Sequence, residues 1–174
     1  MKQNNKNRGF SVIELVLVIG IIAVIAAFTL PNLFNRKSVT ELNNTVNQIS
    51  ITLREAQSRA ISQSGGSEWG VRFDNSNPPY FAMFSTPDYS SSTRVIYTTL
   101  PQGIGYATST LAADSYTDVV FGQITGKPSQ PLSLGLYPII EGQPILIVSV
   151  ALSGQIALID PAQPVTAATV AAVA

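Results

Sequence analysis

Side chains that could carry out chemistry are few in this chain, because it contains neither cysteine nor histidine. Their absence excludes disulfide frameworks, zinc sites built from Cys and His, thiol nucleophiles and Ser-His-Asp triads. One carboxylate stands out by its position, since Glu14 lies in a segment, residues 10–30, that is otherwise almost purely apolar. We therefore expect no catalytic residue and no bound cofactor, and the surroundings of Glu14 become the first candidate for function.

The apolar segment has the length of a membrane-spanning helix, about 20 residues for a hydrocarbon core of about 30 Å. Basic residues precede it without any acid, namely Lys2, Lys6 and Arg8. This bias predicts a cytoplasmic N-terminus and an exported remainder. Three interpretations are open: a secretory signal peptide cut after Ala26, an uncleaved signal anchor, and a segment cut on its cytoplasmic side between Gly9 and Phe10.

Glu14 favours the third interpretation on energetic grounds. Insertion of an isolated carboxylate into a bilayer costs about 2.5–3.5 kcal/mol. Cleavage before Phe10 would free an α-amine four positions from Glu14, and two unit charges about 4 Å apart attract by roughly 4 kcal/mol at an effective dielectric near 20. The amine could belong to the same helix or to a neighbouring subunit. Further on, Pro31 predicts either a kink or local melting of the helix, or a helix boundary.

The stretch RGFSVIELVLVIGIIAVIAAFTLPNL resembles the N-terminal signal of type IV pilins and type II secretion pseudopilins. The resemblance implies that a prepilin peptidase cuts between Gly9 and Phe10 and methylates the Phe10 amine. It assigns Glu14 and Pro31 to assembly, with Glu14 meeting the Phe10 amine of an adjacent pilin or pseudopilin subunit. It also implies a single-pass protein of the inner membrane, with its head periplasmic or extracellular, that later enters a pilus or pseudopilus.

Beyond the apolar segment, the chain changes first to a helical and then to a strand-like pattern. Apolar residues three and four positions apart form one helix face; they are Val39, Leu42, Val46, Ile49, Leu53, Ala56 and Ala60. After Gly65-Gly66, short alternating runs predict strands at residues 69–73, 80–84, 94–99, 118–121, 132–137, 145–150 and 155–159. The fold class is thus α+β, a long helix packed on an antiparallel sheet.

These patterns divide the chain into five expected parts. They are a cleaved leader (1–9), a transmembrane or fibre-core helix (10–31), an amphipathic helix (32–64), a β head (65–160) and a flexible tail (161–174). The order of elements in the head resembles minor pseudopilins and minor pilins of the GspH/FimT type. That resemblance implies a structural subunit of a type II secretion or type IV pilus machine, not an enzyme.

Two alternatives to this function stay open. An exported binding domain on an ordinary anchor would leave Glu14 unexplained. A DNA-uptake minor pilin would need basic residues near the C-terminus, but no basic residue follows Lys127, so we do not expect nucleic acid as a partner. We expect no metal site either, since the acids at Asp74 and at Asp114 to Asp118 fit turns better than calcium loops.

Overall fold

The computed structural model describes residues 11–86, 89–90, 93–139 and 145–161 of the 174 in the chain, without the side chains of residues 27–37. The chain forms two compact units, residues 1–37 and 38–174. The expected cleavage site, Gly9 and Phe10, and the expected tail after Pro161 lie outside the described residues.

The described part of the first unit is the N-terminal part of helix α1, which runs from Val12 to Ile61 over 50 residues. The backbone stays helical through Pro31, so the alternative of a helix boundary at this proline is wrong. Loss of one backbone hydrogen bond is tolerated inside a long helix whose other turns remain paired. Among the described residues, no helix combines the length and apolar character needed to cross a membrane.

In the second unit, α1 buries one face. The predicted apolar face is confirmed from Leu42 onward, since the side chains of Leu42, Val46, Ile49, Leu53, Ala56 and Ala60 are all 0–1% exposed. The helix ends at Ile61, and a short 3-10 turn follows at Ser64–Gly66. Gly65 and Gly66 have positive φ angles of 71° and 65°, a conformation that ends helices and suits glycine.

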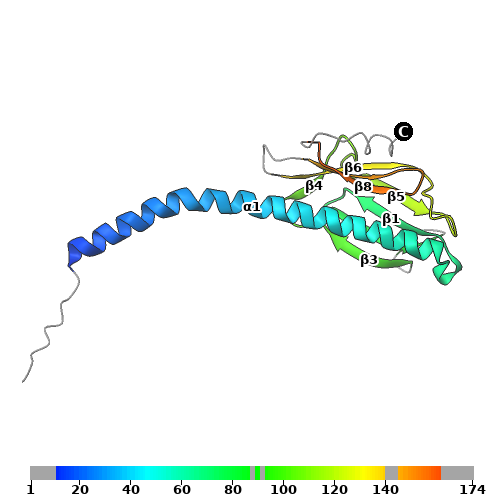
Figure 1. Cartoon of the computed structure of the whole chain (residues 1–174), viewed down its shortest axis with the longest axis horizontal. Coiled ribbons are helices and arrows are strands. Elements are labelled where there is room, and N and C mark those ends of the chain that lie inside the picture. Colours follow the sequence, from blue (N-terminus) through cyan, green and yellow to red (C-terminus); the bar gives the residue numbers. More distant parts are fainter. Residues whose placement is uncertain (1–10, 87–88, 91–92, 140–144, 162–174) are drawn as a thin grey trace, which may run out of the picture. The chain divides into compact units, whose positions relative to one another are not determined.

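The head contains eight strands in two antiparallel sheets (Figure 1). The first sheet has the order β3-β2-β1-β5, and the second has the order β4-β6-β7-β8. In chain order the strands are β1 (Trp69–Asp74), β2 (Tyr80–Ser85), β3 (Arg94–Thr99), β4 (Ile104–Tyr106), β5 (Tyr116–Phe121), β6 (Leu132–Pro138), β7 (Leu146–Val150) and β8 (Ile156–Ile159).

The α+β class with a long helix on antiparallel strands is therefore confirmed, with one difference. The sequence predicts a single sheet, whereas the structure has two, and the three-residue strand β4 is not predicted. One apolar cluster joins the buried face of α1 to inward side chains of both sheets, among them Phe73, Phe121 and Leu134. This cluster lies wholly within the second unit.

Candidate functional site

The first candidate site is the N-terminal segment, of which the structure describes the part from Ser11 onward. Glu14 lies in the first turn of α1, and its backbone N–H donates to the Ser11 carbonyl at 3.1 Å. Ser11 and Glu14 thus have the spacing of a capping box. A carboxylate here also faces the positive end of the helix dipole. A purely local role in starting the helix is therefore possible for Glu14 beside the expected role in assembly.

The side chains that follow Glu14 form an apolar surface on the helix. Those from Leu15 to Ile25 are all exposed, with Leu15 at 57% and Ile25 at 58%. Exposure of so many large apolar side chains around a helix is unfavourable in water. This part of α1 therefore requires an apolar environment, such as lipid or neighbouring helices. Pro31 lies in the same helix, and its side chain is outside the description.

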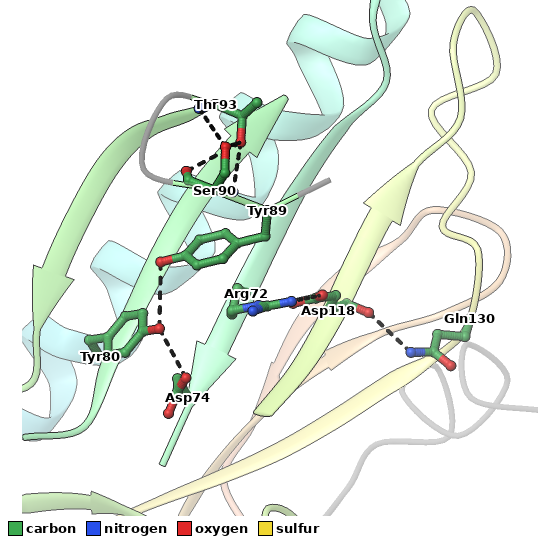
Figure 2. Close-up of polar contacts among 8 residues, drawn as sticks. All are labelled: Arg72, Asp74, Tyr80, Tyr89, Ser90, Thr93, Asp118 and Gln130. Carbon is green, nitrogen blue, oxygen red and sulfur yellow. Dashed lines mark hydrogen bonds and ion pairs between the residues drawn. The ribbon is translucent and has the colours of Figure 1, made fainter. Parts of the chain in front are cut away.

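The second candidate site is a polar cluster on the outer face of the first sheet (Figure 2). Arg72 of β1 donates two hydrogen bonds to Asp118 of β5, at 2.7 Å from Nε and 2.6 Å from Nη2. The two residues face each other directly in the antiparallel register of the two strands. The Arg72 guanidinium also stacks on two rings, at 4.1 Å from Tyr89 and 3.9 Å from Tyr116.

Asp74 extends this cluster toward β2. Its carboxylate accepts hydrogen bonds from the Ser76 backbone N–H and the Tyr80 hydroxyl, both at 2.9 Å. Burial alone would raise the pKa of Asp74, but the hydrogen bonds from Ser76 and Tyr80 and the charge of Arg72 outweigh it, so the net pKa is lowered. Burial and hydrogen bonds to Tyr89 and Asp74 raise the pKa of Tyr80, which keeps its hydroxyl protonated.

The cluster binds the segment after β2 to the sheet. Tyr89 reaches Tyr80 with its hydroxyl at 3.5 Å and packs edge-on against Phe84 with ring centroids 5.3 Å apart. Hydrogen bonding to Asp118 raises the pKa of Arg72, against the opposing effect of burial. The charged groups are engaged with one another and with the Tyr80 hydroxyl. The cluster is therefore suited to stabilise the sheet and its covering loop.

Sequence reasoning missed this cluster because its members come from separate strands. The expected turn at Asp74 agrees with the hydrogen bond from Ser76, which closes an Asx turn. Asp118 serves as the partner of Arg72. In the described part of the chain, no group of three or more Asp, Glu, His or Cys residues could hold a metal ion.

The remaining arginines of the head do not extend the cluster into a basic surface. Arg59 pairs with Glu55 at 2.7 Å and lies 4.8 Å from the Trp69 ring. Arg94 stacks on Tyr97 at 4.5 Å. Arg54 is 3.4 Å from the Ile156 carbonyl, on the other sheet. Arg54 and Arg59 lie on α1 and Arg94 lies on β3, and each is engaged by a different neighbour.

Comparison with known families gives one match, to the prokaryotic N-terminal methylation motif, over residues 4–30. This match confirms the predicted N-terminal motif, and it includes Gly9, Phe10 and Glu14. No curated protein matches the chain.

Comparison with solved structures confirms a pilin-like fold. The type IV minor pilin FimU of Pseudomonas aeruginosa is 14% identical, with a TM-score of 0.56 over 71% of this chain and 92% of that chain. The minor pseudopilin EpsH of the Type 2 Secretion System of Vibrio cholerae is 17% identical, with a TM-score of 0.50 over 72% of this chain and 99% of that chain. At these identities the likeness concerns the fold.

Proposed function

We propose that this chain is a prepilin-like structural subunit, a minor pilin or minor pseudopilin, of a type IV pilus or type II secretion machine. A prepilin peptidase cuts it between Gly9 and Phe10 and methylates the Phe10 amine. The subunit is inserted in the inner membrane with its N-terminus in the cytoplasm, and it is then incorporated into a helical filament. Its partners are the peptidase and other pilin or pseudopilin subunits, which it meets through the N-terminal part of α1.

The observation that carries this proposal is the joint presence of the methylation motif and the pilin-like head in one chain. The motif covers residues 4–30, and the fold likeness covers 71% of the chain. The exposed apolar surface after Glu14 supports assembly, because neighbouring apolar helices would bury it. The polar cluster supports a structural role, because Arg72 is hydrogen-bonded to Asp118 and Asp74 is hydrogen-bonded to Tyr80.

Intact mass and the N-terminal peptide of the chain recovered from its native membrane test the processing step. We expect a chain that starts at Phe10 and carries one additional methyl group on its amine. A chain that starts near Ala27 would indicate an ordinary signal peptide, and one that still starts at Met1 would indicate an ordinary anchor. Either result would contradict the proposal.

The role of Glu14 is tested by Glu14→Ala, with Val16→Ala as the matched control on the same exposed part of the helix. We expect Glu14→Ala to remain in the membrane but to be lost from sheared filaments at least tenfold, because its carboxylate no longer pairs with the neighbouring amine. Val16→Ala removes only part of one apolar side chain from this surface and should be lost from filaments far less than Glu14→Ala. Equal amounts of both variants in filaments would assign Glu14 to local helix capping instead.

A further inference from the structure

One end of the first sheet carries an open pocket of about 570 Å³. Three separate segments of the chain line it, and all of them belong to the second unit. We name it the strand-end pocket; its lining residues are Gly66, Ser67, Glu68, Thr86, Gly122 and Gln123. Its volume lies in the range of pockets that hold small ligands, so it is a candidate binding site apart from the two already described.

The register of the first sheet explains why these segments meet. Trp69 at the start of β1 lies opposite Ser85 at the end of β2 and opposite Phe121 at the end of β5. Because β1 lies between β2 and β5, Glu68, which precedes β1, lies between the segments that follow those two strands. The Thr86 backbone N–H donates to the Glu68 carbonyl at 2.9 Å, which continues the pairing of β1 and β2 by one residue.

The side chains of the strand-end pocket present mainly hydrogen-bond acceptors. The Gln123 amide uses one hydrogen to donate to the Gly66 carbonyl at 2.8 Å. The hydroxyls of Thr86 and Ser67 donate to backbone carbonyls at 3.3 Å and 3.4 Å. A hydroxyl that donates its hydrogen can still accept, and so can the amide oxygen of a glutamine. These three side chains therefore offer oxygen atoms beside the Glu68 carboxylate.

Glu68 is the charged residue of the pocket lining. Its side chain is exposed, and no ion pair engages it in the part of the chain that the structure describes. Arg59 lies over the neighbouring Trp69 ring at 4.8 Å, but it gives its hydrogen bonds to Glu55 at 2.7 Å and 3.1 Å. The exposed Lys127 does not line the pocket. The Glu68 carboxylate is thus available to a cation from outside.

A primary ammonium group fits this lining better than other cations do. It is a compact charge with three N–H donors, which matches one carboxylate surrounded by neutral oxygen atoms. A guanidinium group favours an aromatic ring to stack on, but the Trp69 ring is buried and already lies beneath Arg59. Calcium takes about six to eight oxygen ligands, for which a lining with one carboxylate is poorly suited.

We propose that the strand-end pocket binds a primary alkylammonium group, with Glu68 as the counter-charge and with Gln123 and Thr86 as acceptors. Such a group occurs in free diamines and in the lysine side chains of other proteins. The inference goes beyond the proposed function, because it concerns a ligand of the head and not the processing or assembly of the N-terminal segment.

Nuclear magnetic resonance titration of the isotope-labelled full-length chain in neutral detergent tests this site through the amide signals of Gly122 and Gln123. Cadaverine serves as the free diamine, and Nα-acetyl-lysine methylamide represents a lysine in a protein. Nα-acetyl-norleucine methylamide has a similar shape without the ammonium group. We expect millimolar binding of both amines, because a carboxylate near the surface gives modest affinity, and at least fivefold weaker binding of the norleucine probe.

The two amines distinguish the sources of the ammonium group. Tighter binding of the lysine probe would identify a protein side chain as the ligand, and tighter binding of cadaverine would identify a free diamine. Equal binding would show that the ammonium group alone is recognised. Equal binding of the norleucine probe, or unshifted signals with all three probes, would overturn the proposal.

Glu68→Gln keeps the size of the side chain and removes its charge, so we expect the affinity for the lysine probe to fall at least fivefold. Thr86→Val removes one acceptor and should lower the affinity by a smaller factor. Asp114→Asn is the matched control, since it removes an exposed carboxylate that does not line the pocket; it should bind like the natural chain. An affinity that is unchanged in Glu68→Gln, or lowered equally in Asp114→Asn, would overturn the site.

Discussion

At the residue scale, the outer face of the first sheet holds its charged groups through direct contacts with one another. The Arg72 side chain is 17% exposed; it is hydrogen-bonded to Asp118, and its guanidinium lies 4.1 Å and 3.9 Å from the ring centroids of Tyr89 and Tyr116. Planar stacking and paired hydrogen bonds suit arginine and not lysine. Such contacts are stronger than an isolated surface pair because each partner fixes the others.

Asp74 makes the stability of the head dependent on pH. Its pKa lies below the ordinary value of 3.8 in the folded chain, so its ionised form stabilises the fold above that value, and this stabilisation is lost as the pH falls through the lowered pKa. We expect Asp74→Asn to cost about 0.5–1 kcal/mol near pH 7, because the group is half-buried. The difference from the natural chain should shrink toward about pH 3.

Denaturation of the full-length chain in detergent, followed by the fluorescence of the single tryptophan, measures this effect, since Trp69 lies in the core of the head. Asp114→Asn is the control, because Asp114 is exposed and should leave the free energy of unfolding unchanged at both pH values. If the cost of Asp74→Asn stays constant between pH 7 and 3, the lowered pKa of Asp74 is not the source of the pH dependence.

At the scale of elements, the Gln57 amide joins α1 to the β5–β6 turn at Gly126 and to the β7–β8 turn at Gly154. The lack of a side chain at Gly154 makes this junction possible. A Cβ atom at Gly154 would lie 2.7 Å from Gln57 Nε2 and 3.0 Å from the Gly126 carbonyl oxygen, with φ at 88°. Gly154→Ala should therefore lower the free energy of unfolding by about 2–4 kcal/mol, from backbone strain and the displaced amide together. Urea titration of the full-length chain provides the measurement.

Gly103→Ala is the matched control for the turn. Gly103 has a similar φ of 96°, but a Cβ atom there would meet nothing within 4 Å. We expect a cost of about 1 kcal/mol from the backbone alone. If the two alanine variants lose equal stability, the junction at Gln57 contributes nothing beyond backbone conformation.

Local sequence patterns predicted the helix and most strands of this fold. They did not predict which residues far apart in the chain pair with each other. The spacing of Leu42, Val46 and Ile49 fixes the buried helix face, and alternation fixes most strands, because both depend on neighbouring residues. The Arg72–Asp118 pair joins residues 46 positions apart. The two residues meet because of the register of β1 and β5, which the packing of the whole sheet determines. The division into two sheets and the three-residue β4 are likewise set by tertiary packing.

At the scale of the whole molecule, the N-terminal methylation motif and the apolar core belong to different units. Gly9, Phe10 and Glu14 lie in the unit of residues 1–37, whereas the apolar cluster lies in residues 38–174. The N-terminal methylation motif was predictable because its positions are adjacent in the chain. The junction of Gln57 with two turns was not, since it joins residues 69 and 97 positions apart.

Ile124 offers a substitution that should stabilise the head, because its φ of 66° is disfavoured for a β-branched residue and its side chain is 66% exposed. Ile124→Asn relieves an unfavourable left-handed conformation and loses little buried surface, so we expect the free energy of unfolding to rise by about 0.5–1 kcal/mol. Ile51→Asn is the control, because Ile51 is 65% exposed but helical, and asparagine should slightly destabilise it. Urea titration compares the two.

An Ile124→Asn chain that is less stable than the natural chain would contradict this prediction. It would show that the Ile124 side chain, although 66% exposed, supports its own fold more than the left-handed backbone opposes it.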